Sequence, residues 1–357
     1  MKFLLPVTII ASLFLSNVEA RWKPTPLTTW NYVLGHDVVI KNEKATVVDM
    51  DVRKSKQKID DLHKAGKKVI CYFSAGTLED FRDDYDDFKN VKGLVQNAYD
   101  DWPDEYWLDF RVEGIKPLIK KRMQIAVDKK CDGIEVDNLD GYQMDEVKRW
   151  KKPLTEEDTI KYVKWLGSTA HELGISIGLK NVVGIIDKVS SYFDFAINES
   201  CVNYNECKRY SNFLKQGKAV FGVTYNGLEK HKKALCNNLN GVPISMIVKE
   251  GDSLVQEGII FDGKKYCGSS FKTGLETTVK TTTTVKKTST KKTTKKTTKK
   301  TTKKTTKKTA QKTTKKTTKK TTKKTTKKTT KRTTTNKKTN RRITRVKVIT
   351  KVITKKK

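Results

Sequence analysis

The residues best suited to chemistry lie in the stretch Cys131–Tyr142, where an apolar run ends in carboxylates, an amide and a tyrosine. Glu135 and Asp137 alternate with Ile134 and Val136, so in a strand both carboxylates project from one face. Barrel and doubly wound enzymes place their catalytic groups at the carboxyl ends of parallel strands. The alternative is a strand followed by an acidic, solvated loop. The alternation favours a catalytic site over that alternative.

A series of β-prone runs, separated by gaps of helical length, predicts the elements that position this stretch. Such alternation implies a parallel sheet with right-handed crossovers, and eight strands in about 255 residues favour an α/β fold closed into a (β/α)8 TIM-like barrel. A doubly wound open sheet is the alternative, but no Gly-x-Gly-x-x-Gly follows the first strand. The predicted strands are Thr29–Leu34, Thr46–Met50, Lys68–Ser74, Asp132–Asp137, Ser176–Leu179, Phe193–Ile197, Ala219–Tyr225 and Ile244–Lys249.

Two of the gaps carry clear helix signals. Apolar residues within 115–127 recur with i, i+3 and i+4 spacing, which predicts an amphipathic helix leading into the carboxylate strand. After that strand, Thr155 with Asp158 three residues later resembles a capping box and predicts the start of a second helix.

Polar side chains also end most of the other predicted strands, whereas lysines such as Lys67-Lys68 and Lys129-Lys130 lie at the amino ends. This polarity is typical of an active site on one face of a barrel. The polar strand ends are Asp49 and Asp51, Tyr72 and Ser74, Lys180 and Asn181, Asn198 and Glu199, and Tyr225.

Several motifs in order along the chain make it similar to glycoside hydrolase family 114. They are Val69–Gly76, Trp107–Asp109, Cys131–Tyr142, Ile177–Asn181, Phe193–Glu199, Tyr204–Cys207 and Gly217–Phe221. The resemblance covers roughly residues 28–270. It implies a secreted barrel enzyme with endo-α-1,4-polygalactosaminidase activity, which hydrolyses polymers of α-1,4-linked galactosamine.

Glycoside hydrolysis needs two carboxyl groups, and Asp137 and Glu199 fit this requirement. They end the fourth and sixth strands, which belong to the same alternating set, so their inward side chains should lie at similar heights. The family's proposed acidic pair falls on these two motifs, which implies Asp137 as nucleophile and Glu199 as general acid/base. Their roles remain exchangeable, because the sequence gives neither the carboxylate separation nor the pKa values.

The other polar residues near the strand ends are expected to bind substrate: Asp49, Asp51, Tyr72, Ser74, Glu135, Asn138, Asp140, Tyr142, Lys180, Asn181 and Tyr225. For Glu135, which lies deeper, a structural hydrogen-bonding role is an equal alternative. Lys180 could be an ion-pair partner that keeps one carboxylate charged, or an ordinary strand-end lysine, and its Gly-Leu-Lys-Asn context favours the site. The loop residues Asn138, Asp140 and Tyr142 could form a tight turn, and Tyr72 and Tyr225 could be core residues.

The six cysteines predict a disulfide framework, because their number is even and the chain carries a secretory signal. Cys201 and Cys207 enclose a short loop that could close on itself. We expect no metal and no cofactor, since no Cys-x-x-Cys pair occurs.

The first twenty residues predict a secretory signal peptide, with Lys2, an apolar run to Leu15 and small residues before a cleavage point after Ala20. The run is short for a membrane span, and no later segment approaches the roughly 20 apolar residues that a span needs. The expected parts are therefore a signal peptide over 1–20, a hydrolase domain over 21–275 and a tail over 276–357.

The tail holds most of the formal charge of +35, because residues 277–357 contain 34 Lys and Arg and no acidic residue. The remaining chain has 41 basic and 40 acidic residues. A segment of Thr-Thr-Lys-Lys repeats has almost no apolar surface, which predicts disorder. We expect it to bind an anionic cell-wall or matrix polymer rather than a specific nucleic acid, since no aromatic residue interrupts it for base stacking.

Two functions fit these observations. The first is a secreted, monomeric endo-glycosidase retained at the cell wall or matrix by its tail. The second is a non-catalytic carbohydrate-binding barrel that acts as an adhesin or structural protein. The presence of both Asp137 and Glu199 favours the enzyme.

Overall fold

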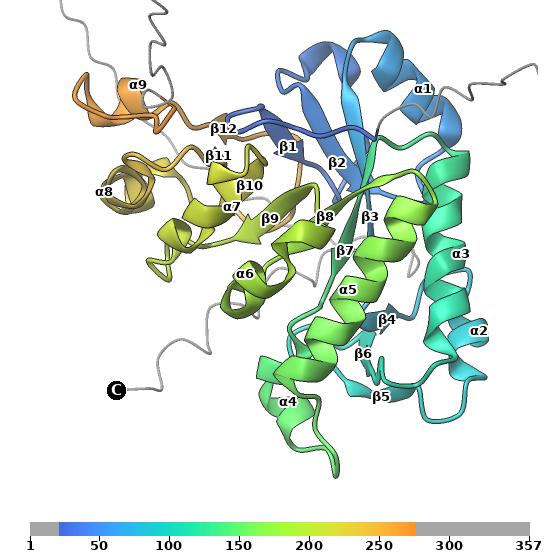
Figure 1. Cartoon of the computed structure of the whole chain (residues 1–357). Helices are drawn as coiled ribbons and strands as arrows, with labels where there is room; N and C mark the ends of the chain where they lie inside the picture. Colours follow the sequence, from blue (N-terminus) through green and yellow to red (C-terminus); the bar gives the residue numbers. More distant parts are fainter. Residues whose placement is uncertain (1–20, 276–357) are drawn as a thin grey trace, which may run out of the picture. The chain divides into compact units, whose positions relative to one another are not determined.

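The computed structural model describes residues 21–275 (Figure 1). The predicted signal peptide, 1–20, and the predicted Thr/Lys tail, 276–357, lie outside the described residues, and both remain predictions. Within 21–275, no helix is long and apolar enough to cross a membrane.

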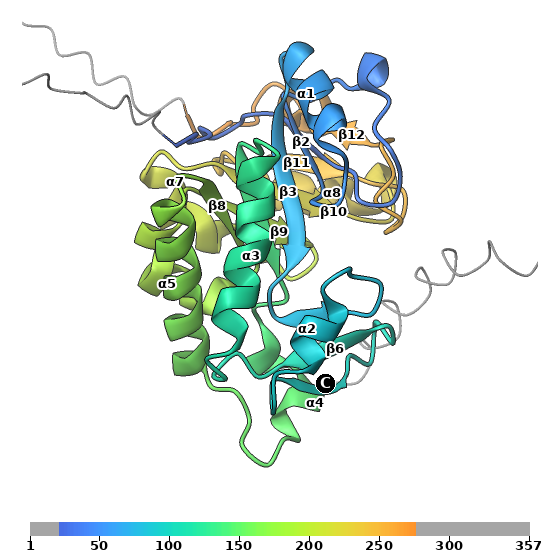
Figure 2. The ribbon, with the colours of Figure 1, turned by 90° about the vertical axis from the view of Figure 1, so that its right-hand side faces the viewer.

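Eight parallel strands form a nearly closed barrel, so the predicted (β/α)8 architecture is confirmed and the open-sheet alternative is wrong (Figures 1 and 2). All eight predicted strands are present, each within two residues of its expected bounds. In sheet order they are β1 (Trp30–Tyr32), β2 (Val47–Asp51), β3 (Lys68–Ser74), β7 (Gly133–Asp137), β8 (Ser176–Lys180), β9 (Phe195–Glu199), β10 (Val220–Thr224) and β11 (Ser245–Val248). A short ninth strand, β12 (Ile259–Ile260), pairs antiparallel with β11.

Side chains join β1 to β11, the two strands that meet where the barrel closes. The indole Nε1 of Trp30 donates a hydrogen bond to the carbonyl of Ser245, at 2.8 Å. Near the other end of this seam, the ammonium group of Lys249 donates to Asn31 Oδ1 and to the carbonyl of Val255, each at 2.6 Å. Through these bonds the buried polar side chains at the seam are hydrogen-bonded, as buried polar groups almost always are.

The helices follow from local signals in the sequence. The capping box is confirmed, because Thr155 accepts from the Asp158 backbone and the Asp158 side chain accepts from that of Thr155. The 115–127 periodicity is confirmed as well, with its apolar side chains buried against the strands. The helices are α1 (Lys56–Lys64), α2 (Tyr85–Lys89), α3 (Ile115–Asp128), α4 (Asp145–Lys148), α5 (Glu156–Glu172), α6 (Ile186–Val189), α7 (Ser211–Lys215), α8 (Leu228–Leu239) and α9 (Gly263–Cys267).

Between β3 and α3 the chain forms a small antiparallel sheet that the sequence pattern does not predict. It consists of β4 (Thr77–Glu79), β6 (Glu105–Leu108) and β5 (Val95–Ala98), in that order. Strands this short carry too few residues to show a clear alternation. The sheet adjoins the carboxyl end of β3, where the backbone N–H of Leu108 donates to the carbonyl of Gly76 at 2.9 Å. It therefore brings residues that the strand pattern did not single out to the edge of the site.

The core has two parts, as expected when both faces of a parallel sheet are covered. One part lies between the strands and the outer helices. The other fills the barrel interior with alternate residues of the strands: Trp30, Tyr32, Val47, Ile70, Phe195, Ile197, Phe221, Val223 and Ile247. Along β9, the inward residues change from Phe195 and Ile197 to Glu199 at the carboxyl end. The apolar filling thus supports the polar end from below.

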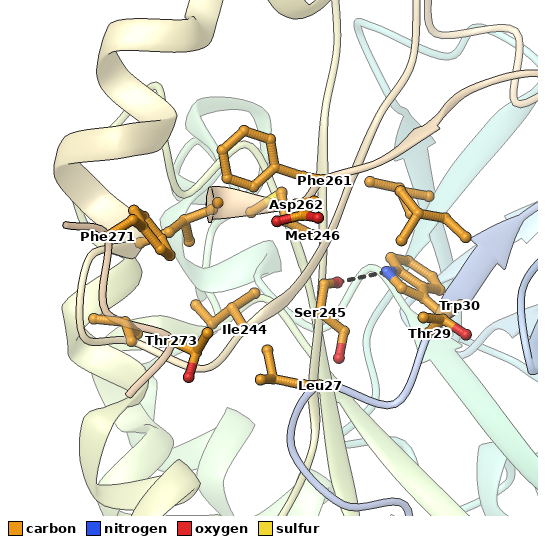
Figure 3. A pocket seen from close by; sticks show the side chains of 15 residues that line it. Leu27, Thr29, Trp30, Ile244, Ser245, Met246, Phe261, Asp262, Phe271 and Thr273 are labelled. Carbon is orange, nitrogen blue, oxygen red and sulfur yellow. Dashed lines mark hydrogen bonds between the residues drawn. The ribbon is translucent and has the colours of Figure 1, made fainter. Parts of the chain in front are cut away.

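An apolar cavity of about 230 Å³ lies beside the seam, between β11, β12 and α9 (Figure 3). Trp30, Ile244, Met246, Phe261 and Phe271 are among its lining residues. None of the predicted site residues lines it.

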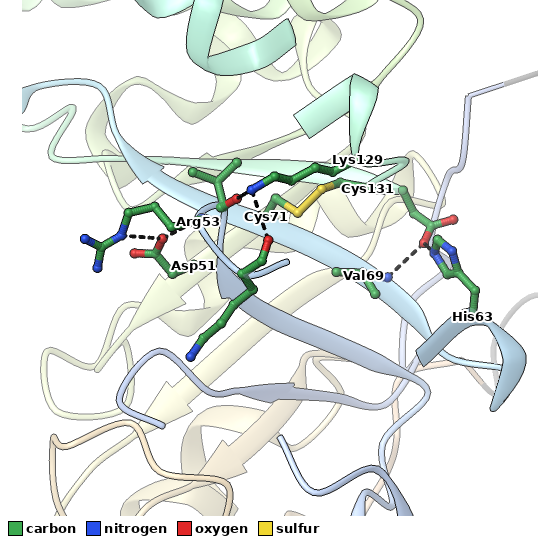
Figure 4. Close-up of a disulfide and its surroundings, with 10 residues drawn as sticks. Asp51, Arg53, His63, Val69, Cys71, Lys129 and Cys131 are labelled. Carbon is green, nitrogen blue, oxygen red and sulfur yellow. Dashed lines mark hydrogen bonds and ion pairs between the residues drawn. A yellow bond between two sulfur atoms is a disulfide. The ribbon is translucent and has the colours of Figure 1, made fainter. Parts of the chain in front are cut away.

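Three disulfides use all six cysteines, as predicted, and the proposed Cys201–Cys207 pairing is confirmed. Cys71 of β3 is bonded to Cys131, the residue two positions before β7 (Figure 4). Close to this bond, Asp132 accepts from the backbone N–H of Val69 and from His63, each at 2.8 Å. The third disulfide joins Cys236 of α8 to Cys267 of α9. The Cys71–Cys131 bond links β3 and β7, the two neighbouring strands that carry Tyr72 and Asp137.

We predict that the Cys71–Cys131 bond contributes more stability than the Cys201–Cys207 bond. The two bonds close loops with sequence separations of 60 and 6 residues. Loop-closure entropy then favours the folded state by about 4 and about 2 kcal/mol respectively. Paired Cys→Ala replacements, compared by denaturant unfolding without reductant, measure this order. An equal or reversed loss of unfolding free energy would contradict it.

Candidate active site

A buried lysine lies at the centre of the carboxyl end of the barrel. Lys180, the last residue of β8, is only 1% exposed. Its ammonium nitrogen lies 2.7 Å from Glu135, 3.1 Å from Asp137 and 3.3 Å from Glu199. Burial lowers the pKa of Lys180, but the charges of these carboxylates outweigh burial and raise it well above its usual value. Lys180 therefore stays positively charged and holds the three acidic side chains together.

The strand register explains why these groups meet. Glu135 of β7 lies opposite Gly178 of β8, and Lys180 lies opposite Ile197 of β9. A side chain at Gly178 would collide with the ring of Phe195, so the barrel interior has no room for one there. Because inward positions recur every second residue, Glu135, Lys180 and Glu199 all point into the barrel.

Asp137 accepts two hydrogen bonds and forms one ion pair while remaining 17% exposed. Lys180 and the backbone N–H of Asn138 contact Oδ1, at 3.1 and 2.8 Å, and the hydroxyl of Tyr72 donates to Oδ2 at 3.2 Å. Lys180 and Asn138 thus fix Oδ1 of Asp137, whereas Oδ2 has only one donor.

Glu199 has fewer donors and is more open to solvent. It is 30% exposed, and Lys180 contacts its Oε2 while the hydroxyl of Tyr225 donates to its Oε1. Burial and the charge of Glu199 raise the pKa of Tyr225 well above its usual value, so the phenol remains a donor. The backbone N–H of Glu199 donates to Asn181 Oδ1 at 3.0 Å, which fixes the end of β9 against the end of β8.

The contacts with Lys180 limit the distance between the two exposed carboxyl groups. Asp137 Oδ1 and Glu199 Oε2 both bind one ammonium nitrogen, at 3.1 and 3.3 Å. These two oxygens are therefore at most about 6.4 Å apart, a bound that includes the spacing of about 5–5.5 Å in retaining glycosidases and lies just below the 6.5–9.5 Å in inverting ones.

Three neighbouring strands end in the same unusual backbone conformation. Asn138, Asn181 and Ser200 directly follow β7, β8 and β9, and each has a positive φ, of 59°, 49° and 65°. Non-glycine residues in this region are sparsely populated and cluster at functional sites. The sharp turns stop each strand immediately after its polar residue, so Asp137, Lys180 and Glu199 remain at the mouth of the barrel.

Asn138 is held by a hydrogen-bond network that reaches the inserted sheet. Its amide nitrogen lies 3.0 Å from Ser74 Oγ, 2.9 Å from Thr77 Oγ1 and 3.3 Å from Glu105 Oε2. Ser74 is fully buried and also contacts Thr77, at 2.6 Å. Ser74 and the side-chain amide of Asn138 therefore stabilise the turn that follows Asp137. Thr77 and Glu105 were missed because they lie on the unpredicted sheet.

Asp51 lies in a different ion-pair network from Lys180. Its Oδ1 contacts Arg82 at 3.1 Å and Arg53 at 3.3 Å, and Arg82 also contacts Glu79. Burial raises the pKa of Asp51, but the two arginines outweigh burial and lower it below its usual value. The structure therefore places Asp51 beside β4 rather than among the carboxylates at Lys180.

Asp140 and Tyr142 lie in the loop after β7, where both remain partly exposed. Burial, followed by the charge of Asp137, raises the pKa of Asp140 to about 6. A group that titrates near neutrality can change the charge of the site within the range of ordinary conditions.

Asp49 and Glu135 lie deeper, and both are fully buried. Glu135 Oε1 accepts from Lys180 and, at 3.0 Å, from the hydroxyl of Tyr32. Tyr32 ends β1 and points inward like Trp30, so the rule applied to the other strand ends could have identified it. Lys180 thus contacts three other predicted site residues, Glu135, Asp137 and Glu199, and also the hydroxyl of Tyr32.

Residues 12–271 match glycoside-hydrolase family GH114. The crystal structure of Aspergillus fumigatus Ega3 in complex with galactosamine is similar at 34% identity and a TM-score of 0.62, over 68% of this chain and 98% of that one. The glycoside hydrolase domain of PelA from Pseudomonas aeruginosa shares the fold, at 15% identity and a TM-score of 0.50, over 65% and 98% of the two chains. None of the curated proteins matches.

These findings confirm the resemblance that the motifs indicated. The family match spans nearly all of the described barrel, and the similarity to Ega3 extends over almost the whole of that chain. Both carboxyl groups expected from the family motifs lie at the mouth of the barrel, in contact with one lysine. The chain therefore belongs to glycoside-hydrolase family GH114.

Proposed function

We propose that this glycoside hydrolase is secreted and cuts within polymers of α-1,4-linked galactosamine, with Asp137 and Glu199 as its catalytic pair. The observation that carries the proposal is the joint contact of both carboxyl groups with Lys180 at the barrel mouth. The galactosamine bound in the similar Ega3 structure supports the choice of sugar. Glycosidases use two carboxyl groups in this way, one ionised and one protonated.

The proposed reaction begins with Asp137 as the nucleophile. Its Oδ2, which has a single donor, attacks the anomeric carbon while the bond from that carbon to the glycosidic oxygen breaks. Glu199, as a carboxylic acid, gives its proton to the departing oxygen. Glu199 then removes a proton from water, which attacks the anomeric carbon and releases Asp137. The upper limit of about 6.4 Å between Asp137 Oδ1 and Glu199 Oε2 is compatible with this retaining route.

Lys180 has a positioning role in this proposal. It stabilises the carboxylate of Asp137 before the attack and the carboxylate of Glu199 after proton transfer, because it contacts both. Asp140, Tyr142, Tyr72 and Tyr225 surround the pair and are proposed to contact the sugar. Acidic side chains at the mouth attract an amino sugar whose amine is free and protonated.

We predict that Asp137→Asn and Glu199→Gln abolish cleavage without unfolding the protein. Loss of general acid/base catalysis by Glu199 lowers kcat by about 10²–10⁴-fold, and loss of the nucleophile lowers it at least as much. The assay measures oligosaccharides released from partially deacetylated galactosamine polymer. Asp60→Asn and Glu229→Gln, on the outer helices α1 and α8, are the matched controls and retain activity.

The same digestion distinguishes the mechanisms. Proton NMR during early turnover shows an α-anomeric product if the reaction retains configuration, whereas a β-anomeric product would exclude Asp137 as nucleophile. Binding of the polymer without cleavage by the wild type and both variants would instead support a carbohydrate-binding adhesin.

We predict that Asp140 makes binding of the cationic polymer depend on pH near its pKa of about 6. As the pH rises from about 5 to about 7, Asp140 ionises, the mouth gains a negative charge, and KM falls. Asp140→Asn removes this part of the KM profile, while the titration of the polymer's own amines remains in both proteins. If the ratio of the two KM values, wild type to Asp140→Asn, is the same at about pH 5 and about pH 7, the prediction is contradicted.

The same shift gives a stability test for Asp140. The pKa of Asp140 is raised in the folded state from 3.8, so its protonated form stabilises the fold at low pH. This contribution is complete below about pH 4 and is lost as the pH rises through about 6. The unfolding free energy of the wild type therefore falls relative to Asp140→Asn over that range.

We further propose that the basic tail retains the enzyme on anionic wall or matrix polymers. The 34 basic residues of 277–357 support this, since binding by a polycation grows with the number of charges. A chain ending at residue 275 is predicted to bind an anionic polymer more weakly and with less dependence on salt, while its turnover of soluble substrate is unchanged. Equal retention by both chains would contradict this role.

A further inference from the structure

Two buried carboxyl groups face each other below the proposed catalytic pair. Asp49 of β2 and Glu135 of β7 are both 0% exposed, and their side chains are in hydrogen-bonding contact. Both oxygens of Asp49 and Oε2 of Glu135 are buried and receive no hydrogen bond from an N–H or O–H donor. Buried polar atoms are almost always paired. Two carboxylates, however, can bond to each other only if a proton lies between them.

The charges around this contact also require a proton. Asp49, Glu135, Asp137 and Glu199 surround one ammonium group, that of Lys180, which touches the last three. The hydroxyl of Tyr32 faces the group from β1, and burial keeps it neutral by raising its pKa well above its usual value. With Glu199 protonated as proposed, three negative charges would still face a single positive one, and two of them, on Asp49 and Glu135, are fully buried. Two adjacent carboxyl groups in such a site do not both ionise.

The hydrogen bonds indicate which group carries the proton. Glu135 Oε1 accepts from Lys180 at 2.7 Å and from Tyr32 at 3.0 Å, and both donors stabilise its ionised form. Asp49 has no such donor, so an ionised Asp49 would bear the full cost of a buried, unpaired charge. The proton therefore belongs on Asp49, from which it can bond Glu135 Oε2.

We propose that Asp49 is a protonated carboxylic acid that donates a hydrogen bond to Glu135 and so positions Lys180 between Asp137 and Glu199. Burial, and then the neighbouring Glu135, raise the pKa of Asp49 well above its usual value, which agrees with this assignment. Because Asp49 is completely buried, this role replaces the substrate contact expected for it from the sequence.

The consequence for catalysis rests on the proposed function. With Asp49 neutral, Glu135 presents a single negative charge beneath Lys180, and the ammonium group can share its other contacts between Asp137 and Glu199. An ionised Asp49 would place a second negative charge below Lys180 and draw the ammonium group away from the pair. Asp49 is therefore a positioning residue that acts through Glu135 and Lys180.

Infrared difference spectroscopy tests the proton directly, on the full chain without substrate. The spectrum of the wild type minus that of Asp49→Asn at neutral pH is expected to show the carbonyl stretch of a protonated carboxyl group. If the difference instead shows the bands of a carboxylate, Asp49 is ionised and the proposal is overturned. This result does not depend on activity, so it decides the inference even if the protein fails to cleave galactosamine polymers.

Kinetics of matched variants test the positioning role. Asn at position 49 can still donate to Glu135, so Asp49→Asn is expected to keep kcat within about threefold of the wild type. Asp49→Ala removes the donor and leaves Glu135 Oε2 unpaired, so kcat falls at least about tenfold while KM changes little. Thermal unfolding of both variants verifies that they fold. A loss of activity in Asp49→Asn as large as in Asp49→Ala would overturn the proposal.

The pH profile provides a second kinetic readout. The titratable groups that face Asp49 are Glu135 and Asp137 of β7, Lys180 of β8 and Tyr32 of β1. All of them are present in both the wild type and Asp49→Asn. At alkaline pH, the wild type is expected to lose activity before Asp49→Asn, because only the wild type can ionise at this position. An earlier alkaline loss in the variant would contradict the assignment.

Discussion

The buried ammonium group of Lys180 is the interaction on which the site depends. An ammonium group inside a barrel is costly unless carboxylates surround it, and several carboxylates at one point are equally costly without a cation. Glu135, Asp137 and Glu199 therefore need Lys180 as much as it needs them. Mutual dependence of this kind fixes the relative positions of side chains from three strands, and this fixed geometry is what two-carboxylate chemistry requires. The barrel contributes the apolar layer that lies below the cluster.

Much of this arrangement could be predicted because parallel strands leave a simple record in the sequence. A strand covered on both faces is apolar along its length, so the eight strands were visible as runs, and the polar residue that ends each run marks one face of the barrel. That rule predicts that Glu135, Asp137, Lys180 and Glu199 lie together at one end of the barrel. It also covers Tyr32, which ends the first strand.

The features that escaped prediction depend on contacts between distant segments. Thr77 and Glu105 reach Asn138 from strands of three or four residues, too short for a recognisable pattern. Asp51 looked like its counterparts at other strand ends, but Arg82, 31 residues later, pairs with it instead. The contact between Asp49 and Glu135 crosses β3, which lies between their strands, and a pairwise reading of neighbouring strands does not reveal it.

The disulfide Cys201–Cys207 links the geometry of Glu199 to the chemistry of the surroundings in which the protein folds. Cys201 lies two residues beyond Glu199, and its backbone N–H donates to Asn198 Oδ1 at 2.8 Å, so the bond closes the loop that continues directly from the end of β9. Disulfides form and persist in oxidising compartments and are rare where thiols are kept reduced. In a reducing compartment this loop would lack its covalent closure. The oxidation state of two cysteines thereby becomes part of how the segment after Glu199 is assembled, which couples assembly of the site to the redox history of the chain.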